Sequence, residues 1–387
     1  MTTLTRPLGG GGIAERLRHA LTGLDWILVA AVLVISTFGL LTVRAATRTD
    51  IPGRPDYYFS RSLVFLLLGV GLMVLAAVLP TWRLTQLPWA VWGALLGALA
   101  VVFVVGGSAK GSTRWIELGA FRFQPSELGK AALCLILAGL VAERAKEVGS
   151  RRLTLLLVGV TALPAIVVFV QPDLGTALVY GAILLAILFL AGVPWTHLAT
   201  MLAVIVAAST LVLAVLPAAG IEVLKPYQVN RLLTFTGTVD DPGDAGYQQN
   251  QSEIAVGQGG ALGKGPGGAT QTNNDFLPEH HTDFIFAVVA EMFGFVGAGG
   301  LILAYGLVLW RGMGLVARAS SQADQLVAGG IVAMLAFQVF VNIGMTVGIM
   351  PITGIPLPFM SYGGSHTLSN LIAVGLLLGI HRRRATI

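Results

Sequence analysis

The chain alternates between long apolar runs and short polar segments over most of its length. Ten of these runs approach the roughly 20 residues that an α-helix needs to cross a lipid hydrocarbon core. The runs are continuous and lack the alternating pattern of an outer-membrane β-barrel. The pattern therefore predicts an all-α, polytopic membrane helical bundle of about ten transmembrane helices. The expected spans lie near residues 26–45, 62–80, 88–106, 126–143, 153–171, 174–193, 196–217, 283–310, 324–350 and 364–380.

One long polar segment, residues 218–282, separates the seventh run from the eighth. It closes on the sequence E-H-H-T-D, and Asp283 leads directly into the next apolar run. A carboxylate at the point where a water-exposed loop enters a bilayer is costly unless it has a function. We therefore predict a large extracytoplasmic loop whose C-terminal end carries the chemistry.

Composition supports the membrane class, because only 11% of the residues are charged and 55% are hydrophobic, against roughly 25% charged in a soluble domain. We expect membrane lipids around the protein and no nucleic-acid partner. Cys134 is the single cysteine and lies within an apolar run. It cannot form an intramolecular disulfide, and we expect it to serve packing.

The distribution of Lys and Arg favours a cytoplasmic N-terminus, since basic residues are enriched in cytoplasmic loops. The run after residue 25 is too long for the apolar region of a signal peptide. We expect a cytoplasmic tail at 1–25, a transmembrane domain at 26–380 and a second cytoplasmic tail at 381–387. Some cations remain on the expected outer face, notably Arg114 and Arg122, and these suggest an anionic partner such as a diphosphate.

Four segments with polar or Gly/Pro-rich sequence reach the outer face in this topology: 111–130, 171–176, the end of the long loop, and 351–365. Irregular backbone at membrane depth is tolerated only where it is buried in protein or lines a wet cavity. The four segments are therefore expected to form one outward-facing polar site.

Within the first of these segments, Glu127 and Lys130 are three residues apart, so they share one helical face and should pair. Such a pair is either a buried ion pair that neutralises itself or part of a functional site. Asp173 lies in a tight turn between two spans, where a local Asx-turn and a ligand role are both open.

Asp283 follows Glu279, His280 and His281, so carboxylates and imidazoles converge at one helix start. The aspartate could be functional or a simple helix N-cap. Adjacent histidines point in different directions on a regular backbone and do not match a zinc signature, so structural zinc is not expected. A hard divalent cation held by Asp283 and Glu279 together with a diphosphate remains open.

The long loop also contains the glycine-rich stretch 257–268, which includes Lys264. Its backbone N–H groups could approach phosphate oxygens. The spacing is not that of a nucleotide-binding P-loop. A flexible linker is the alternative.

Several segments together resemble the SEDS family of shape, elongation, division and sporulation proteins, in order along the chain. The form K-P-Y-Q-V-N-R at 225–231 is more similar to the elongation branch, RodA, than to the division branch, FtsW. The matching segments are R-W-I-E-L-G-A-F-R-F-Q-P-S-E-L-G-K, Q-P-D-L-G-T-A, N-R-L-L-T-F, D-A-G-Y-Q-Q-N-Q-S-E-I-A-V-G, G-A-L-G-K-G, F-L-P-E-H-H-T-D-F-I-F-A-V-V-A-E and G-I-P-L-P-F-M-S-Y-G-G-S.

The resemblance implies a peptidoglycan glycosyltransferase that polymerises lipid II on the outer face of the cytoplasmic membrane during elongation. It also implies a class B penicillin-binding protein as partner, and a divalent cation, Mg or Mn, is expected. Asp283 matches the family's essential aspartate, Glu127 and Lys130 match its polar pair, and Asp173 and Lys264 match further motif positions. The other candidate residues in matched segments are Arg114, Glu279, His281 and Ser361. The sequence departs from the family at His366 and at Ala290, which precedes Glu291.

We hypothesise that Asp283 acts as a general base on the acceptor sugar hydroxyl. Lys130, Lys264, Arg114 or a divalent cation would stabilise the departing diphosphate. Two rival functions remain: a transporter that flips lipid-linked precursors, and a noncatalytic scaffold for a penicillin-binding protein. The polar groups gather on one side of the membrane, whereas transporter sites lie near the midplane.

Overall fold

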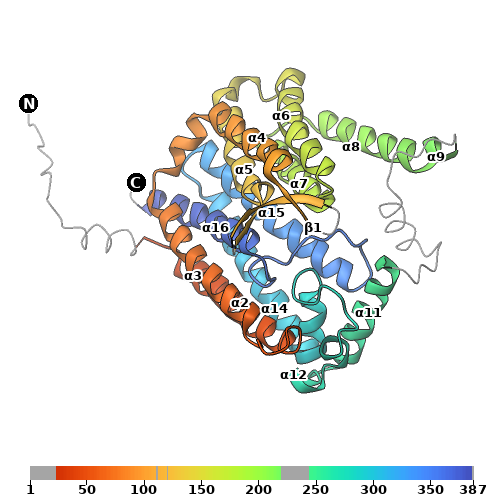
Figure 1. Cartoon of the computed structure of the whole chain (residues 1–387). Helices are drawn as coiled ribbons and strands as arrows, with labels where there is room; N and C mark the ends of the chain where they lie inside the picture. Colours follow the sequence, from red (N-terminus) through yellow and green to blue (C-terminus); the bar gives the residue numbers. More distant parts are fainter. Residues whose placement is uncertain (1–22, 110–111, 120, 219–243, 386–387) are drawn as a thin grey trace, which may run out of the picture.

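The computed structural model describes residues 23–109, 112–119, 121–218 and 244–385, and these residues are mostly helical (Figure 1). The N-terminal tail expected at 1–25 therefore lies almost entirely outside the described residues. The helices are α2 (Trp26–Ala46), α3 (Tyr57–Val78), η1 (Thr81–Gln86), α4 (Pro88–Val105), α5 (Pro125–Glu143), η2 (Ala145–Glu147), α6 (Arg151–Val170), α7 (Leu174–Leu190), α8 (Trp195–Thr210), the π-helical η3 (Leu211–Val215), α9 (Leu216–Ala218), α11 (Asp244–Gln258), α12 (Gly265–Gly268), α13 (Thr270–Asn273), α14 (Ile285–Ala317), α15 (Gln322–Thr346) and α16 (Gly364–Ala385). The strands are β1 (Gly107–Ala109), β2 (Ser112–Leu118) and β3 (Phe121–Phe123).

Each apolar run forms a helix, so the prediction of an all-α membrane bundle is confirmed. Six helices in the described residues are long and apolar enough to cross a membrane: α2, α3, α5, α6, α14 and α15. The runs at α4, α7 and α8 are apolar but shorter, and α16 is the helix of the last run. Helices suit this environment because they satisfy every backbone polar group within the segment.

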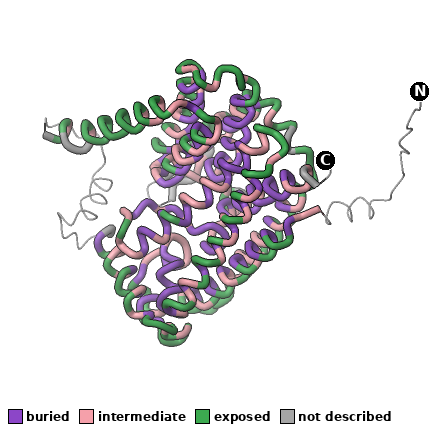
Figure 2. Tube along the Cα trace, turned by 180° about the vertical axis from the view of Figure 1, so that it is seen from behind, coloured by how far each residue is buried: buried purple, intermediate pink, exposed green. Residues whose placement is uncertain are grey.

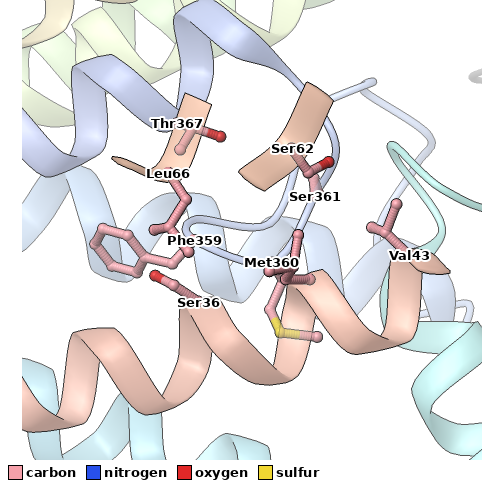
Figure 3. A pocket seen from close by; sticks show the side chains of 9 residues that line it. Ser36, Val43, Ser62, Leu66, Phe359, Met360, Ser361 and Thr367 are labelled. Atoms are coloured by element: carbon pink, nitrogen blue, oxygen red, sulfur yellow. The ribbon is translucent and has the colours of Figure 1, made fainter. Parts of the chain in front are cut away.

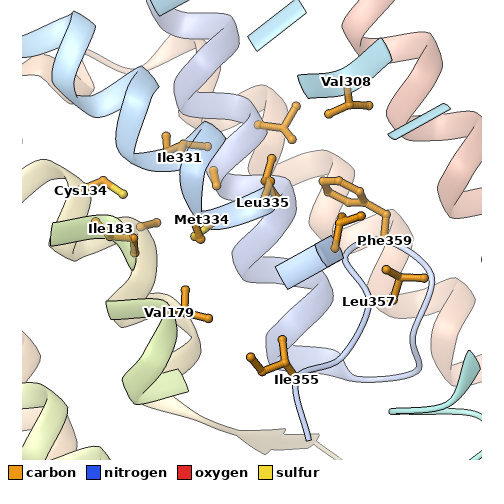
Figure 4. Packing of buried hydrophobic residues seen from close by; sticks show 14 of the residues in the cluster. Cys134, Val179, Ile183, Val308, Ile331, Met334, Leu335, Ile355, Leu357 and Phe359 are labelled. Carbon is orange, nitrogen blue, oxygen red and sulfur yellow. The ribbon is translucent and has the colours of Figure 1, made fainter. Parts of the chain in front are cut away.

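The centre of the bundle is formed by α5 and α15, which pack against each other. Helix α15 also packs against α7, α14 and α16, and α5 packs against α4. Figure 4 shows Cys134, Val179, Ile183 and Ile331 side by side in this core. Cys134 is completely buried there, in the packing role expected from the sequence.

Helix α8 projects from the bundle (Figure 1), and Figure 2 shows it as mostly exposed. Its apolar side chains face outward, with Leu202 63% and Val204 60% exposed. An apolar helix that buries none of its side chains in protein needs another apolar environment. The apolar composition of α8 therefore indicates that lipid surrounds this helix.

Ion pairs join the helices at the end of the bundle where α2 begins and α16 ends. Asp25 caps α2 by accepting from Leu28 N at 3.1 Å, and it forms a 2.7 Å ion pair with Arg311 of α14. At the same end, Arg383 of α16 pairs with Asp324 in the first turn of α15. The polar segments expected to form the site lie at the opposite end.

Two structured parts were not expected from the apolar pattern. The first is the small antiparallel sheet β1-β2-β3, which pairs Glu117 with Arg122. The second is the part of the long loop at 244–282, where α11 packs against α14 and α15. Ser252 of α11 donates to Thr346 O at 2.8 Å. These elements depend on tertiary contacts, so their polar sequences gave no signal. Residues 219–243 of the same loop lie outside the described residues.

The glycine-rich stretch of the loop lies against the backbone of α14. A Cβ on Gly259 would lie 1.9 Å from Ala290 O, and one on Gly263 would lie 2.2 Å from Met292 O. Gly294, with φ of 64°, marks a kink in α14 at this contact. Lys264 N donates to Glu291 O at 2.9 Å. The linker alternative is wrong for Gly259 and Gly263, because close backbone packing leaves no room for a side chain at these two positions.

We expect Gly259→Ala to destabilise the protein, because a backbone carbonyl occupies the position of the new methyl group. Overpacking of this kind typically costs about 1–3 kcal/mol. Gly257→Ala is the matched control, since Gly257 lies within α11 with open space around it. A lower thermal midpoint for Gly259→Ala only would support this contact, and equal midpoints for both variants would contradict it.

Candidate functional site

The segment 351–363 connects several helix ends at the pole opposite the start of α2 and the end of α16. Ser361 Oγ donates to Thr282 O at 2.6 Å and accepts from Leu357 N at 2.8 Å. Tyr362 N donates to His281 O at 2.9 Å. Ser361, a candidate from the sequence, therefore fixes this segment against the residues that precede α14.

Asp283 lies two residues before the start of α14 and is half-buried. Its backbone carbonyl accepts from Asn342 Nδ2 of α15 at 2.8 Å, and the same amide group donates to Ile355 O at 2.8 Å. A Cβ on Gly354 would lie 3.4 Å from Asp283 Oδ2, so segment 351–363 passes close to the carboxylate. The N-cap of α14 is Phe284, without a side-chain cap. Asp283 therefore lies one residue before the N-cap position of α14.

Glu127 and Lys130 do pair, as expected, at the start of α5. Lys130 Nζ lies 2.7 Å from Glu127 Oε2 and donates to Gln338 Oε1 at 3.1 Å. His366 Nδ1 of α16 lies 3.1 Å from the same glutamate oxygen. All four side chains are buried. The sequence had marked His366 only as a departure from the family, but it is the third member of this buried network.

Asp173 is the N-cap of α7, because its Oδ1 accepts from Thr176 N at 3.1 Å. Its Oδ2 accepts from Gln124 Nε2 at 2.8 Å, and this bond ties the start of α7 to the start of α5. The structure thus supports the local capping interpretation. A carboxylate at this position also interacts favourably with the helix dipole.

The remaining sequence candidates lie on separate elements. Arg114 of β2 lies over the ring of Trp115, and Lys264 donates to Gln258 Oε1 at 2.6 Å. Glu279 has a left-handed backbone conformation, with φ of 52°, and its Oε2 accepts from Thr282 Oγ1 at 2.9 Å. Left-handed backbone at a non-glycine residue is often found at functional sites.

Polar residues on one face of α15 were missed by the sequence reading. Gln338, Asn342 and Thr346 are completely buried and spaced four residues apart, so they form one stripe. The stripe contacts Lys130, the backbone of Asp283 and Ser252 of α11. Its signal was present in the sequence, since buried polar residues repeating every four positions in an apolar helix are costly unless used.

Glu291 is a buried carboxylate whose role the sequence did not reveal. It accepts from Gln271 N at 2.8 Å, Thr272 N at 3.1 Å and Thr272 Oγ1 at 2.7 Å. These donors belong to α13, so the carboxylate of α14 holds the end of the long loop in place. Hydrogen bonds to an ionised acceptor are stronger than neutral ones.

Figure 3 shows a small pocket between α2, α3 and segment 351–363. Its volume is about 20 Å³, and Ser36, Ser62 and Ser361 contribute to its lining. That volume accommodates roughly one water molecule. The hydroxyl of Ser62 is buried without a hydrogen-bond partner among the described residues, so a water would satisfy it.

Both histidines before Asp283 lie near Asp50, which belongs to the turn after α2. The expectation that adjacent histidines diverge is wrong here, because the backbone is irregular at Glu279. Burial of His280 opposes a positive charge on the ring, but the nearby Asp50 carboxylate outweighs it and raises the pKa of His280. The region around Asp50, His280 and His281 therefore favours a positive charge.

Comparison with known proteins gives consistent matches over nearly the whole chain. The FtsW/RodA/SpoVE family of cell cycle proteins matches residues 23–386. A probable peptidoglycan glycosyltransferase FtsW of Halorhodospira halophila is 37% identical, covering 95% of this chain and 93% of the relative. The peptidoglycan glycosyltransferase MrdB of Escherichia coli K12 is 35% identical, with 93% and 94% covered. A chain of a solved peptidoglycan synthase complex, which coordinates polymerization and crosslinking, aligns with TM-score 0.76 and 34% identity over 94% of this chain and 99% of that chain.

Proposed function

The chain belongs to the FtsW/RodA/SpoVE family of cell cycle proteins, and we propose that it polymerises lipid II at the pole of the bundle that carries Asp283. Its activity is that of a peptidoglycan glycosyltransferase, in line with relatives of 35–37% identity over nearly the full length. The protein is a multi-pass membrane protein. An elongation and cell-shape role is favoured by the sequence form at 225–231.

One observation carries the assignment of the base: Asp283 lies half-buried beside segment 351–363, just before the N-cap of α14. Its carboxylate would accept the proton from the acceptor sugar 4-hydroxyl while that oxygen attacks the anomeric carbon of the donor. The C–O bond to the diphosphate breaks, and the configuration inverts. A half-buried carboxylate suits this role because a general base must lie within hydrogen-bond reach of the proton that it accepts.

We propose that a hard divalent cation, Mg or Mn, would be held by the carboxylates of Glu279 and Asp283, which are four residues apart in the turn before α14. Magnesium is commonly held by one or two carboxylates and the phosphates of a substrate. When bound, such a cation would neutralise charge that develops on the diphosphate. Lys130 is committed to Glu127 and Gln338 in a buried network, so we assign it to holding the fold of the site.

A crosslinking enzyme is the proposed partner, specifically a class B penicillin-binding protein. The support is the structural similarity to a chain of a synthase complex that coordinates polymerization and crosslinking. The membrane is proposed to be the cytoplasmic membrane, with both termini in the cytoplasm.

The test uses purified full-length chain with lipid II and Mg or Mn, with and without the partner. Formation of glycan polymer is the expected result. Transbilayer movement of lipid II in vesicles without polymer would favour the flippase alternative. Neither activity, together with stimulation of a partner polymerase, would favour the scaffold.

We expect the pole with Asp283 to face the outside of the cell. Single cysteines at Asn274 and Lys146, both exposed, test this in intact cells with a membrane-impermeant thiol reagent. The native Cys134 is buried and should not react with the reagent. Labelling at position 274 and protection at 146 is the expected pattern, and the reverse pattern would overturn the proposed orientation.

A further inference from the structure

A carboxylate and two imidazoles meet where the turn after α2 contacts the residues before Asp283. His280 Nε2 lies 3.4 Å from Asp50 Oδ2, and His281 Nδ1 lies 3.9 Å from the same oxygen. One ligand atom from each residue lies within 4.8 Å of the others. Asp50 lies more than 200 residues before the two adjacent histidines, so no local motif predicts the cluster.

The hydrogen bond at Nδ1 of His280 determines that the lone pair of the neutral ring lies on Nε2. His280 Nδ1 lies 3.0 Å from Leu277 O, and a carbonyl oxygen can only accept, so Nδ1 carries the hydrogen. In the neutral ring, Nε2 therefore presents a lone pair toward the Asp50 carboxylate. Two electron-rich atoms in this position repel each other unless a proton or a metal ion lies between them. An Nδ1–H to backbone carbonyl bond is also the usual support of a metal-binding histidine.

The distance between His280 Nε2 and Asp50 Oδ2 is longer than a normal N–H···O hydrogen bond. Neither His280 Nε2 nor Asp50 Oδ1 has a hydrogen-bond partner among the described residues, although both atoms are buried. Zinc binds nitrogen and oxygen at about 2.0–2.2 Å, which separates two ligands of a tetrahedral ion by roughly 3.3 Å. The observed 3.4 Å between His280 Nε2 and Asp50 Oδ2 matches that separation.

Neighbouring groups hold the second imidazole in place. The ring of Tyr58 lies 4.6 Å from the ring of His281, and Tyr362 lies edge-on to Tyr58 at 5.0 Å. Tyr362 N donates to His281 O. The side chain of His281 is 17% exposed and that of Asp50 is 10% exposed. A fourth ligand position open to water is compatible with this exposure.

We propose that Asp50, His280 and His281 bind one zinc ion, with water as the fourth ligand. Two imidazoles and one carboxylate suit zinc, whereas magnesium prefers oxygen ligands. The ion would link the turn after α2 to the segment that leads into Asp283. This site is distinct from the Glu279 and Asp283 carboxylates proposed for the hard cation, and its occupancy does not depend on lipid II or on the glycosyltransferase reaction.

The experiment measures zinc in the full-length chain, purified in detergent with a tag that contains no histidine. Protein stripped with a chelator is titrated with Zn²⁺ alone, and bound metal is measured by mass spectrometry and by competition with a chromophoric chelator. About one zinc per chain is expected, and Co²⁺ in its place should give the visible absorption of a tetrahedral site. No uptake by the wild-type chain at micromolar free zinc would overturn the proposal and leave a protonated His280 paired with Asp50.

His280→Gln and Asp50→Asn should each reduce zinc affinity at least tenfold. His197→Gln is the matched control, since His197 bonds to Thr154 Oγ1 at 2.9 Å outside this cluster, and it should bind zinc as the wild type does. Zinc should raise the thermal midpoint of stripped wild type and of the control, but not of the two cluster variants. Equal zinc binding by all variants would also overturn the proposal. Because no substrate is used, failure here leaves the proposed glycosyltransferase function untouched.

Discussion

Asp283→Asn is expected to abolish glycan polymerisation while the protein still folds and inserts into the membrane. Asparagine has nearly the same shape but cannot accept the proton, and general acid–base catalysis is typically worth about 10² to 10⁴ in rate. The backbone contact with Asn342 uses the carbonyl of residue 283, so the substitution preserves it. The measurement is the rate of polymer formation from lipid II at saturating divalent cation.

Asp275→Asn is the matched control for this variant. Asp275 is exposed in the same loop and has φ of 54°, a conformation that asparagine tolerates well. It should keep wild-type activity and a wild-type thermal midpoint. Substantial residual turnover in well-folded Asp283→Asn would refute its role as the base and direct attention to Glu279.

Neutralising one member of the Glu127–Lys130 pair is expected to give the largest loss of stability. Removing one partner leaves the other charge buried and unpaired, which costs about 3–5 kcal/mol. Both side chains are almost completely buried, so solvent does not screen the loss. For Lys130→Met, the remaining carboxylate keeps His366 at 3.1 Å, whereas Glu127→Gln leaves both Lys130 and His366 without a carboxylate partner. Glu127→Gln should therefore be the more damaging change.

The double variant Glu127→Gln/Lys130→Met tests this explanation, because it removes both charges together. Its unfolding free energy in detergent should be closer to wild type than that of either single variant. Glu117→Gln serves as the control, since its 3.6 Å pair with Arg122 is more than half exposed and surface pairs contribute little. Single variants as stable as the wild type would show that the buried pair does not support the fold.

The helices were predictable because bilayer thickness sets the length of an apolar run and lipid requires internal hydrogen bonding. The ends of the helices were less predictable. Helix α3 begins at Tyr57, five residues before the expected run, because its first turn lies beyond the apolar stretch. The expected break at the long loop was correct, but α11 is a polar helix stabilised by burial of Ser252 and Ala255 against neighbours. Such contacts leave no apolar periodicity to detect.

The candidate site also has parts that the sequence predicted and parts that only the structure revealed. The Glu127–Lys130 spacing places both groups on one face of any helix, so their pairing followed from the sequence. His366 joins them from a helix more than 230 residues away, which only packing could reveal. Asp173 had two open interpretations, and its bonds to Thr176 and Gln124 show the local one, a helix cap, while the ligand role stays a prediction.

The sequence by itself determined the membrane class, the helices and the position of Asp283 at the start of an apolar run, because these follow from local hydrophobicity and spacing. The tertiary structure decided which polar groups share a pole. It brought Asn342 to the backbone of Asp283 and pressed Gly259 against α14. It also turned both histidines toward Asp50, through a left-handed residue at Glu279. Contacts between distant segments depend on how helices pack and on irregular backbone between them, and neither is encoded in any short stretch of sequence.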